Sequence, residues 1–169
     1  MASRNIDDLV PEMQTLFYTF QNKMNIAGIA FIVTCTARNV KEQVALYAQG
    51  RQSLDEVNNL RAMAGLPSIT EEENARKVTW TLQSKHLIDL DDGDPNNDKA
   101  RAFDIAILKD KKATWDIKVD VNNDDIPDYQ EAGQIGESVG LMWGGSWQKK
   151  PDYPHFELPT APVVTVQTT

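Results

Sequence analysis

The stretch LMWGGSWQKKPDYPHFEL, residues 141–158, indicates how this chain folds. Leu141–Trp143 and His155–Leu158 have the apolar and aromatic content of short strands. The residues between them, 144–154, are rich in glycine, lysine and proline, which is typical of a turn-rich connection. Two short strands joined in this way can pair antiparallel. We therefore expect an antiparallel element at this end of the domain.

The rest of the chain is predicted to contain both helices and strands, without regular alternation between them. Apolar residues recur at helical spacing over residues 6–24, 40–49, 53–64 and 129–139, and residues 29–34 and 102–108 have the composition of strands. Helix ends are predicted from Ser53 and Thr70 as N-caps and from Gly28, Gly50, Gly65 and Gly140 as stops. Because no regular β-α-β alternation appears, we expect an α+β fold in which helices flank a small antiparallel sheet.

The length and hydrophobic content fit one domain. A chain of 169 residues with 41% hydrophobic residues can bury one core. We place this domain at residues 1–158 and expect residues 159–169, rich in Pro, Thr and Val, to be a loosely held tail. No stretch approaches the roughly 20 apolar residues that span a bilayer. We therefore expect a monomer without stable membrane association.

Acidity is concentrated in two segments of a chain whose net charge is −8. Residues 87–98 contain five Asp, and residues 120–131 contain four Asp and one Glu. The remaining 15 acidic residues are nearly balanced by 17 Lys and Arg. The overall charge argues against a nucleic-acid partner, because such partners require a basic surface.

The single cysteine, Cys35, excludes an internal disulfide and suits a reducing cytoplasm. It ends an apolar run that begins at Ile26, so we expect a buried structural thiol and no nucleophile. The first ten residues, MASRNIDDLV, do not combine a basic and an apolar region, and we expect no secretory signal.

The chain contains two histidines, His86 and His155, each in a setting rich in turn-forming residues and with carboxylates nearby. A catalytic zinc ion takes three protein ligands with nitrogen or oxygen donors and leaves a fourth position for water. Two histidines and one carboxylate would satisfy this requirement. The residues themselves leave the identity of the carboxylate open.

Several blocks of the sequence resemble the zinc D-Ala-D-Ala carboxypeptidase and L-alanyl-D-glutamate endopeptidase family, which includes vancomycin-resistance dipeptidases and phage endolysins. The specific block is WGGSWQKKPDYPHFEL, residues 143–158. The others are TAR at residues 36–38, QVALYAQGR at residues 43–51, SKH at residues 84–86 and ARAFD at residues 100–104. The matches keep the family order, and the resemblance implies the hedgehog/DD-peptidase-like fold.

The resemblance implies that His86, Asp104 and His155 bind zinc. The family places the Asp seven residues after the first His, whereas here the separation is 18 residues, which implies an insertion of about 11 residues that carries the first acidic segment. Asp89 is therefore a rival third ligand. We choose Asp104 because it lies in a predicted strand. The sequence also has Ala37 where the family commonly has Tyr.

The same resemblance assigns the catalytic roles. Asp152 would be the general base, and Arg38 would stabilise the developing oxyanion. Ser84 would orient His86 or contact substrate. For Gln43 and Tyr47 we prefer a scaffold role, and for Glu157 a supporting one. Trp143 and Trp147 would either line the cleft or pack in the core.

These residues imply a zinc metallopeptidase that hydrolyses peptidoglycan stem peptides. Compact relatives without a signal peptide are typically phage endolysins, so we expect an L-alanyl-D-glutamate endopeptidase made in the cytoplasm of a host bacterium and released to the cell wall through a separate membrane pore. The alternatives are a D-Ala-D-Ala carboxypeptidase or dipeptidase and a non-catalytic, metal-stabilised module that binds cell-wall peptides.

The second acidic segment has the ligand spacing of an EF-hand-type calcium loop. Residues 120–131 place oxygen donors at positions 1, 3, 5, 7, 9 and 12, namely Asp120, Asn122, Asp124, the carbonyl of Ile126, Asp128 and Glu131. Position 6, where such loops have glycine, is Asp125. We expect calcium binding here, in addition to zinc, with a solvated acidic loop as the alternative.

Overall fold

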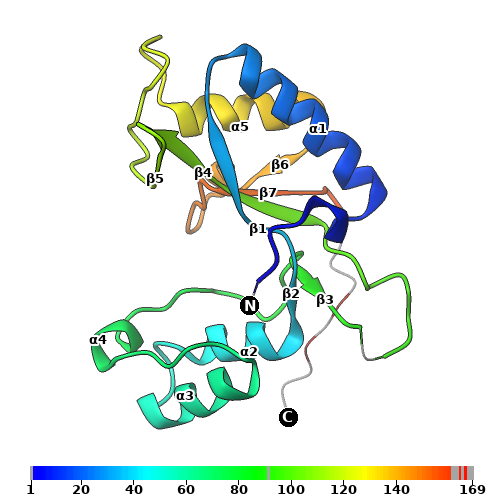
Figure 1. The fold of residues 1–169 in the computed structure, drawn as a ribbon, viewed down its shortest axis with the longest axis vertical. Coiled ribbons are helices and arrows are strands. Elements are labelled where there is room, and N and C mark those ends of the chain that lie inside the picture. Colours follow the sequence, from blue (N-terminus) through cyan, green and yellow to red (C-terminus); the bar gives the residue numbers. More distant parts are fainter. Residues whose placement is uncertain (1, 91, 161–163, 165, 167–169) are drawn as a thin grey trace.

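The sheet at the centre of this computed structural model, which describes residues 2–90, 92–160, 164 and 166, is antiparallel. Its strand order is β1-β4-β7-β6, and β5 pairs with β4. The strands are β1 (Phe31–Cys35), β4 (Ala102–Lys109), β5 (Lys112–Thr114), β6 (Met142–Trp143) and β7 (His155–Glu157). The predicted α+β fold with an antiparallel sheet is therefore confirmed (Figure 1).

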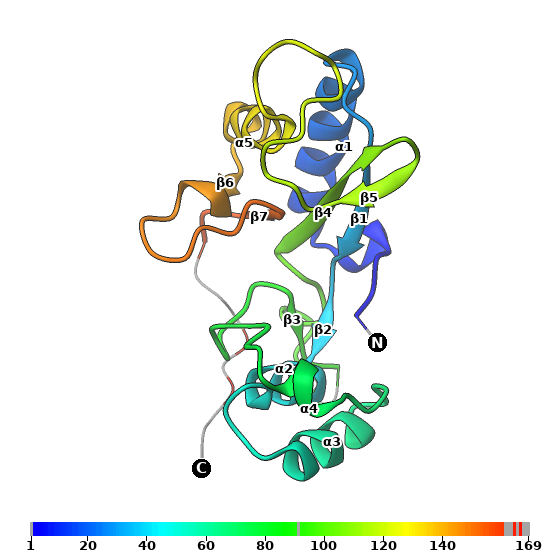
Figure 2. The ribbon, with the colours of Figure 1, turned by 90° about the vertical axis from the view of Figure 1, so that its left-hand side faces the viewer.

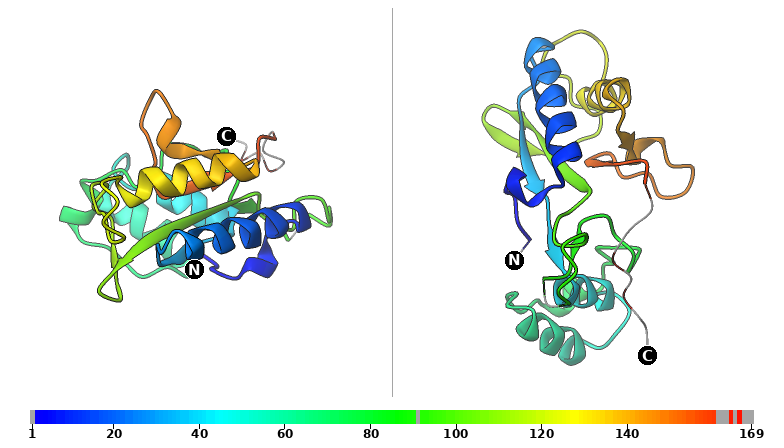
Figure 3. Two further views of the ribbon diagram at one scale, coloured as in Figure 1. Left: turned by 90° about the horizontal axis from the view of Figure 1, so that it is seen from above. Right: turned by 90° about the vertical axis from the view of Figure 1, so that its right-hand side faces the viewer.

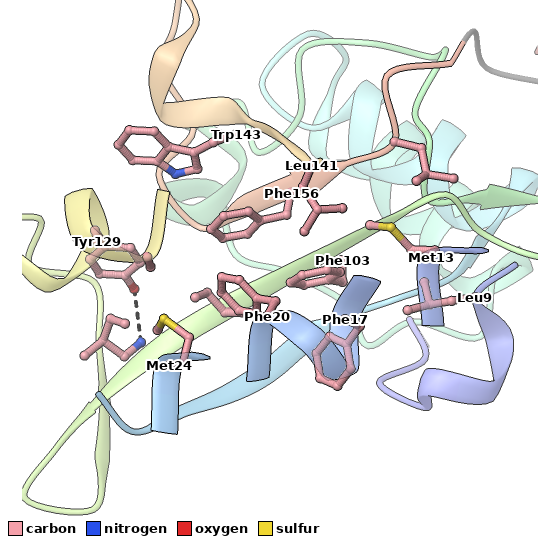
Figure 4. Packing of buried hydrophobic residues seen from close by; sticks show 14 of the residues in the cluster. Leu9, Met13, Phe17, Phe20, Met24, Phe103, Tyr129, Leu141, Trp143 and Phe156 are labelled. Atoms are coloured by element: carbon pink, nitrogen blue, oxygen red, sulfur yellow. Dashed lines mark hydrogen bonds between the residues drawn. The ribbon is translucent and has the colours of Figure 1, made fainter. Parts of the chain in front are cut away.

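Two helices, α1 (Pro11–Ile26) and α5 (Asp128–Val139), lie side by side on one face of this sheet (Figure 3). Their buried residues meet those of β4, in which Phe103, Ile105 and Ile107 alternate toward the helices and are fully buried. Aromatic rings fill the interface: the ring centroid of Phe103 lies 5.1 Å from that of Phe17 and 5.4 Å from that of Phe156 (Figure 4). The opposite face of β4 is left to other residues, which include Asp104.

Glycines bring α5 close to the strands. A side chain at Gly133 would collide with the ring of Trp143, and one at Gly136 would collide with the ring of Phe156. The helix ends at Gly140, whose φ of 103° lies in the left-handed region that glycine adopts without strain. The position of α5 is thus tied directly to β6 and β7.

A second group of helices lies at the end of the molecule away from α1 and α5 (Figure 2). It contains α2 (Val40–Ala48), α3 (Leu54–Met63) and α4 (Glu71–Asn74). Each begins with a capping box, with Asn39, Ser53 and Thr70 as N-caps. A short parallel pair, β2 (Arg38–Asn39) and β3 (Leu87–Ile88), connects this group to the sheet.

The structure corrects the expected start of the first helix. We predicted a helix from residue 6, but α1 begins at Pro11, and a separate 3₁₀ turn, η1 (Ile6–Asp8), precedes it. Leu9 between them forms a bridge with Ala100, and proline at the first helical position favours a new start. The pair β2–β3 and strand β5 were not predicted.

Most of the predicted tail, residues 159–169, lies outside the described residues. Of the part that is described, Val164 is buried. No helix in the described part of the chain has the length and apolar content needed to cross a bilayer.

Candidate metal centre and cleft

The register of two strands brings Asp104 and His155 together. Asp104 on β4 pairs with His155 on β7, and both side chains leave the sheet on the face opposite the aromatic core. The Asp104 Oδ1 atom lies 2.9 Å from His155 Nδ1. The strand context that favoured Asp104 in the sequence therefore positions the carboxylate beside a histidine.

His86 reaches the same point from the segment that leads into β3. The backbone N–H of Arg38 donates to the carbonyl of His86 over 2.8 Å, which anchors this segment to β2. The ring Nδ1 lies 2.8 Å from the carbonyl oxygen of Thr36, so Nε2 faces the two other side chains. It lies 3.0 Å from Asp104 Oδ1 and 3.2 Å from His155 Nδ1.

These three atoms fit a zinc ion. In tetrahedral coordination with bonds of about 2.0–2.1 Å, neighbouring ligand atoms are about 3.3 Å apart. The separations of 2.9, 3.0 and 3.2 Å among Asp104 Oδ1, His86 Nε2 and His155 Nδ1 are close to that value. The predicted ligands thus converge on one point, and small outward shifts would accommodate the ion.

Cys35 is also close to this group. It pairs with Asp104 in the sheet, and potential donor atoms of Cys35, His86 and Asp104 lie within 4.8 Å of one another. Its Sγ atom contacts His86 Nδ1 at 3.5 Å, the nitrogen already engaged by Thr36. His155 closes the triangle at shorter distances, so we assign the third ligand to His155. Cys35 is buried as predicted. Its contact with the candidate ligand His86 was not predicted.

A second layer of contacts orients His155. Its Nε2 atom lies 2.9 Å from Glu157 Oε2, and Glu157 Oε1 accepts a hydrogen bond from Lys85 Nζ over 2.8 Å. Metal-bound histidines commonly donate their second ring nitrogen to a carboxylate in this way. The supporting role predicted for Glu157 therefore has a geometric basis.

The carboxylate charge in this cluster favours a bound cation. Burial by itself lowers the pKa of His86, but the adjacent Asp104 carboxylate outweighs it and raises the pKa to about 10. Burial likewise raises the pKa of Asp104, but the two histidines hold it well below its usual range. A metal ion would compete with protons for the lone pairs of these groups.

The cluster lies in a cleft of about 490 Å³. Its described lining includes Arg38, Ser84, Asp152 and Trp147 together with the three candidate ligands. Arg38 donates from its guanidinium to Asp104 Oδ2 over 3.4 Å and to Gln43 Oε1 over 3.5 Å. Gln43 is buried and also donates to the carbonyl of Thr81 over 2.7 Å, which agrees with a scaffold role.

Asp152 enters the cleft from a tight turn. Its backbone N–H donates to the carbonyl of Gly144 over 2.9 Å, and its own carbonyl accepts from the N–H of His155. A side chain at Gly144 would collide with this turn. Burial in the cleft wall raises the pKa of Asp152, the charge of Asp104 raises it further, and the histidines and Arg38 oppose the rise. A carboxylate with a raised pKa is a better proton acceptor.

The remaining predicted residues separate into cleft and core. The Ser84 hydroxyl accepts from the N–H of His86 over 3.3 Å. Trp147 lines the cleft with its ring centroid 5.2 Å from that of His155, whereas Trp143 is buried and donates to the carbonyl of Tyr153. The rival ligand Asp89, which follows β3, is not among the described residues that line the cleft.

Among the cleft residues that the sequence analysis missed are two tryptophans. Trp80 and Trp115 line the cleft and are more than half exposed. The ammonium group of Lys150 lies 3.4 Å from the ring centroid of Trp80. Neither tryptophan lies in a block that resembles the peptidase family, so no sequence signal placed them at the cleft.

Comparisons with known proteins find a similarity to peptidases that covers part of this site. Residues 98–158 match a family described as D-alanyl-D-alanine carboxypeptidase. That match includes Asp104, Asp152 and His155. The resemblance predicted from the sequence is therefore confirmed.

Two relatives extend the likeness. The chain is 30% identical over 132 residues to the peptidoglycan L-alanyl-D-glutamate endopeptidase CwlK of Bacillus subtilis (strain 168), a match that covers 78% of this chain and 62% of the relative. The chain thus spans less than two thirds of that relative. The crystal structure of the Serratia marcescens L-Ala D-Glu endopeptidase ChiX has the same fold, with a TM-score of 0.53, 16% identity and coverage of 94% of this chain and 88% of the other.

Proposed function

We propose that this protein is a zinc peptidase that hydrolyses peptidoglycan stem peptides. The observation that carries the proposal is the convergence of His86 Nε2, Asp104 Oδ1 and His155 Nδ1 in a cleft that also contains a carboxylate and a guanidinium. This combination supplies three ligands, a proton acceptor and an oxyanion partner, the parts that metal-assisted peptide hydrolysis requires.

His86, Asp104 and His155 would hold the zinc ion. When bound in such a site, zinc acidifies a water molecule and polarises a carbonyl group. The contacts of His86 with Thr36 and of His155 with Glu157 fix the two rings, so that each presents the nitrogen that faces Asp104.

The chain's other residues move protons and balance charge. Asp152 accepts a proton from the attacking water and delivers it to the leaving amine, a role that its raised pKa favours. Arg38 keeps a positive charge in the cleft, next to Asp104 and held by Gln43. There it stabilises the negative charge that develops on the carbonyl oxygen of the scissile bond.

Within this proposal we favour an L-alanyl-D-glutamate endopeptidase. The names of CwlK and ChiX both carry this specificity. The resemblance of residues 143–158 to compact phage enzymes further supports a role as a phage or prophage endolysin. Such an enzyme would be made in the host cytoplasm and reach the wall through a separate pore. A D-Ala-D-Ala carboxypeptidase is the second candidate, because the matching family carries that description.

Mass spectrometry of digested substrates tests the proposal. Zinc-loaded protein is incubated with purified peptidoglycan and with synthetic stem peptides. New L-alanine C-termini with D-glutamate N-termini are expected, and release of terminal D-alanine would favour the second candidate. Zinc binding without release of any amino group from either substrate would instead indicate a non-catalytic binding module.

A further inference from the structure

The acidic loop at residues 120–131 lies outside the cleft and has no part in the proposed reaction. It connects the region after β5 to α5, and its last four residues form the first turn of that helix. Asp120 organises the loop, because its carboxylate accepts the backbone N–H groups of Asn123, Asp124 and Asp125 over 2.7, 3.3 and 3.1 Å. Asp125, at the sixth position, has a φ of 68°, the left-handed conformation for which calcium loops use glycine.

The buried carboxylate of Asp128 belongs to this loop, and only one of its two oxygens accepts a hydrogen bond from a described residue. Asp128 has no exposed surface, and its Oδ2 accepts the backbone N–H of Val121 over 2.9 Å. Its Oδ1 atom is buried and has no hydrogen-bond partner among the described residues. Leaving a buried carboxylate oxygen unsatisfied is costly, and burying the charge itself is more so. A cation inside the loop would remove both costs.

Asn122 presents a second oxygen of the same kind. Its Nδ2 donates to Glu131 Oε2 over 3.0 Å and to the carbonyl of Ala27 over 3.2 Å. Its Oδ1 atom is buried, and the described part of the chain offers it no hydrogen-bond partner. Two buried acceptors with free lone pairs thus lie at the third and ninth positions of the loop, and the glutamate of the twelfth position is held against the third.

The carboxylates of this loop lie close to one another. Among the described residues, no ion pair involves a carboxylate of this loop. Burial raises the pKa of Asp128 and of Glu131, and neighbouring carboxylates of the loop raise both further. Asp128 and Glu131 thus lie close to other negative charges, which a divalent cation would neutralise.

We propose that residues 120–131 bind a calcium ion. The ligands are the side-chain oxygens of Asp120, Asn122, Asp124, Asp128 and Glu131 and the carbonyl oxygen of Ile126. All of them are hard oxygen donors, the ligand set that calcium prefers, whereas the proposed zinc centre combines two histidine nitrogens with one carboxylate. Calcium here is separate from the zinc centre, and its affinity is expected in the micromolar-to-millimolar range.

The packing of α5 connects the proposed calcium site with the strands that carry His155. Calcium fixes the first turn of α5, and that helix contacts Trp143 and Phe156 through Gly133 and Gly136. Phe156 directly follows His155. Calcium binding is therefore expected to stabilise the folded state and, by holding these strands, to support the cleft.

Titration calorimetry of the zinc-loaded, full-length protein with calcium chloride tests the site, with the melting temperature as a second readout. Wild-type protein should bind calcium and melt at a higher temperature in its presence. Glu131→Gln should weaken binding at least about tenfold, since it removes the twelfth-position carboxylate. Asp125→Asn removes the same charge from the same loop without removing a ligand, tolerates a positive φ, and should bind calcium nearly as well as wild type.

Asp120→Ala combined with Asp124→Ala provides a second test, and this double variant should abolish calcium binding. Absence of both calcium heat and a melting shift in wild-type protein would overturn the proposal, as would equal weakening by Glu131→Gln and Asp125→Asn. Calcium binding is measured without substrate, so its failure is distinguishable from failure of the peptidase proposal. If the protein cleaves stem peptides, calcium removal should reduce the rate while zinc, measured by elemental analysis, stays bound.

Discussion

Asp104 and His155 occupy opposed positions on β4 and β7, and their side-chain atoms Oδ1 and Nδ1 approach to 2.9 Å. The pairing of two strands thus sets the spacing of two candidate metal ligands, and His86 completes the group from a separate segment. Ligands fixed by a sheet register cannot drift apart without breaking backbone hydrogen bonds. The first predictions concern this group.

Replacing either histidine should remove the metal. His86→Ala or His155→Ala leaves two ligands, so both variants should lose most of their zinc and unfold at a lower temperature than the zinc-loaded wild type. Elemental analysis and thermal denaturation measure the two effects. Unchanged zinc content in both variants would contradict the assignment.

The choice between the two candidate carboxylates is tested by a matched pair. Asp104→Asn should abolish zinc binding, because it removes the negative charge of the carboxylate whose Oδ1 atom contacts both histidines. Asp89→Asn removes the same charge near β3 and should leave zinc binding nearly intact. The reverse result would mean that the inserted segment supplies the third ligand.

Asp152 is expected to act on the reaction and not on the metal. Asp152→Ala and Asp152→Asn should retain zinc and fold but lose stem-peptide hydrolysis by about 10²-fold or more, the scale of a general base. The exposed Asp55 on α3 offers a control, and Asp55→Asn should retain wild-type activity. Wild-type rates in the Asp152 variants would exclude the role.

Arg38→Ala should lower the rate by about 10²–10³-fold, the scale of a lost oxyanion contact. Arg38→Lys keeps the positive charge but not the paired contacts with Asp104 and Gln43, so partial recovery is expected. Steady-state kinetics on a defined stem peptide compare the two. A rate that is insensitive to both changes would rule out the assigned contact.

Glu157 is a positioning residue, and its effect should appear in metal affinity. Glu157→Gln weakens the partner of His155 Nε2 and frees Lys85, so zinc should bind about 10–100-fold more weakly. Competition with a zinc-binding dye measures this. Glu72→Gln, on the exposed surface of α4, is the control and should leave the affinity unchanged.

The sequence by itself determined the features that depend on near neighbours. Helix caps at Ser53 and Thr70 and the helix end at Gly140 were predicted correctly, because capping is decided within a few residues. The strand at residues 102–108 was recognisable from its apolar content. The resemblance to known peptidases carried the predicted ligands and base, with Asp152 and His155 in residues 143–158 and His86 and Asp104 in two other blocks.

Tertiary structure alone decided what depends on contacts between distant segments. The register of β4 against β7 brought Asp104 to His155 across a separation of 51 residues, and the segment before β3 brought His86 to the same carboxylate across 18 residues. Tertiary packing also placed Cys35 against His86 Nδ1, Trp80 in the cleft lining and Trp143 in the core. No local pattern encodes these outcomes, because strand register is set by packing of the whole sheet.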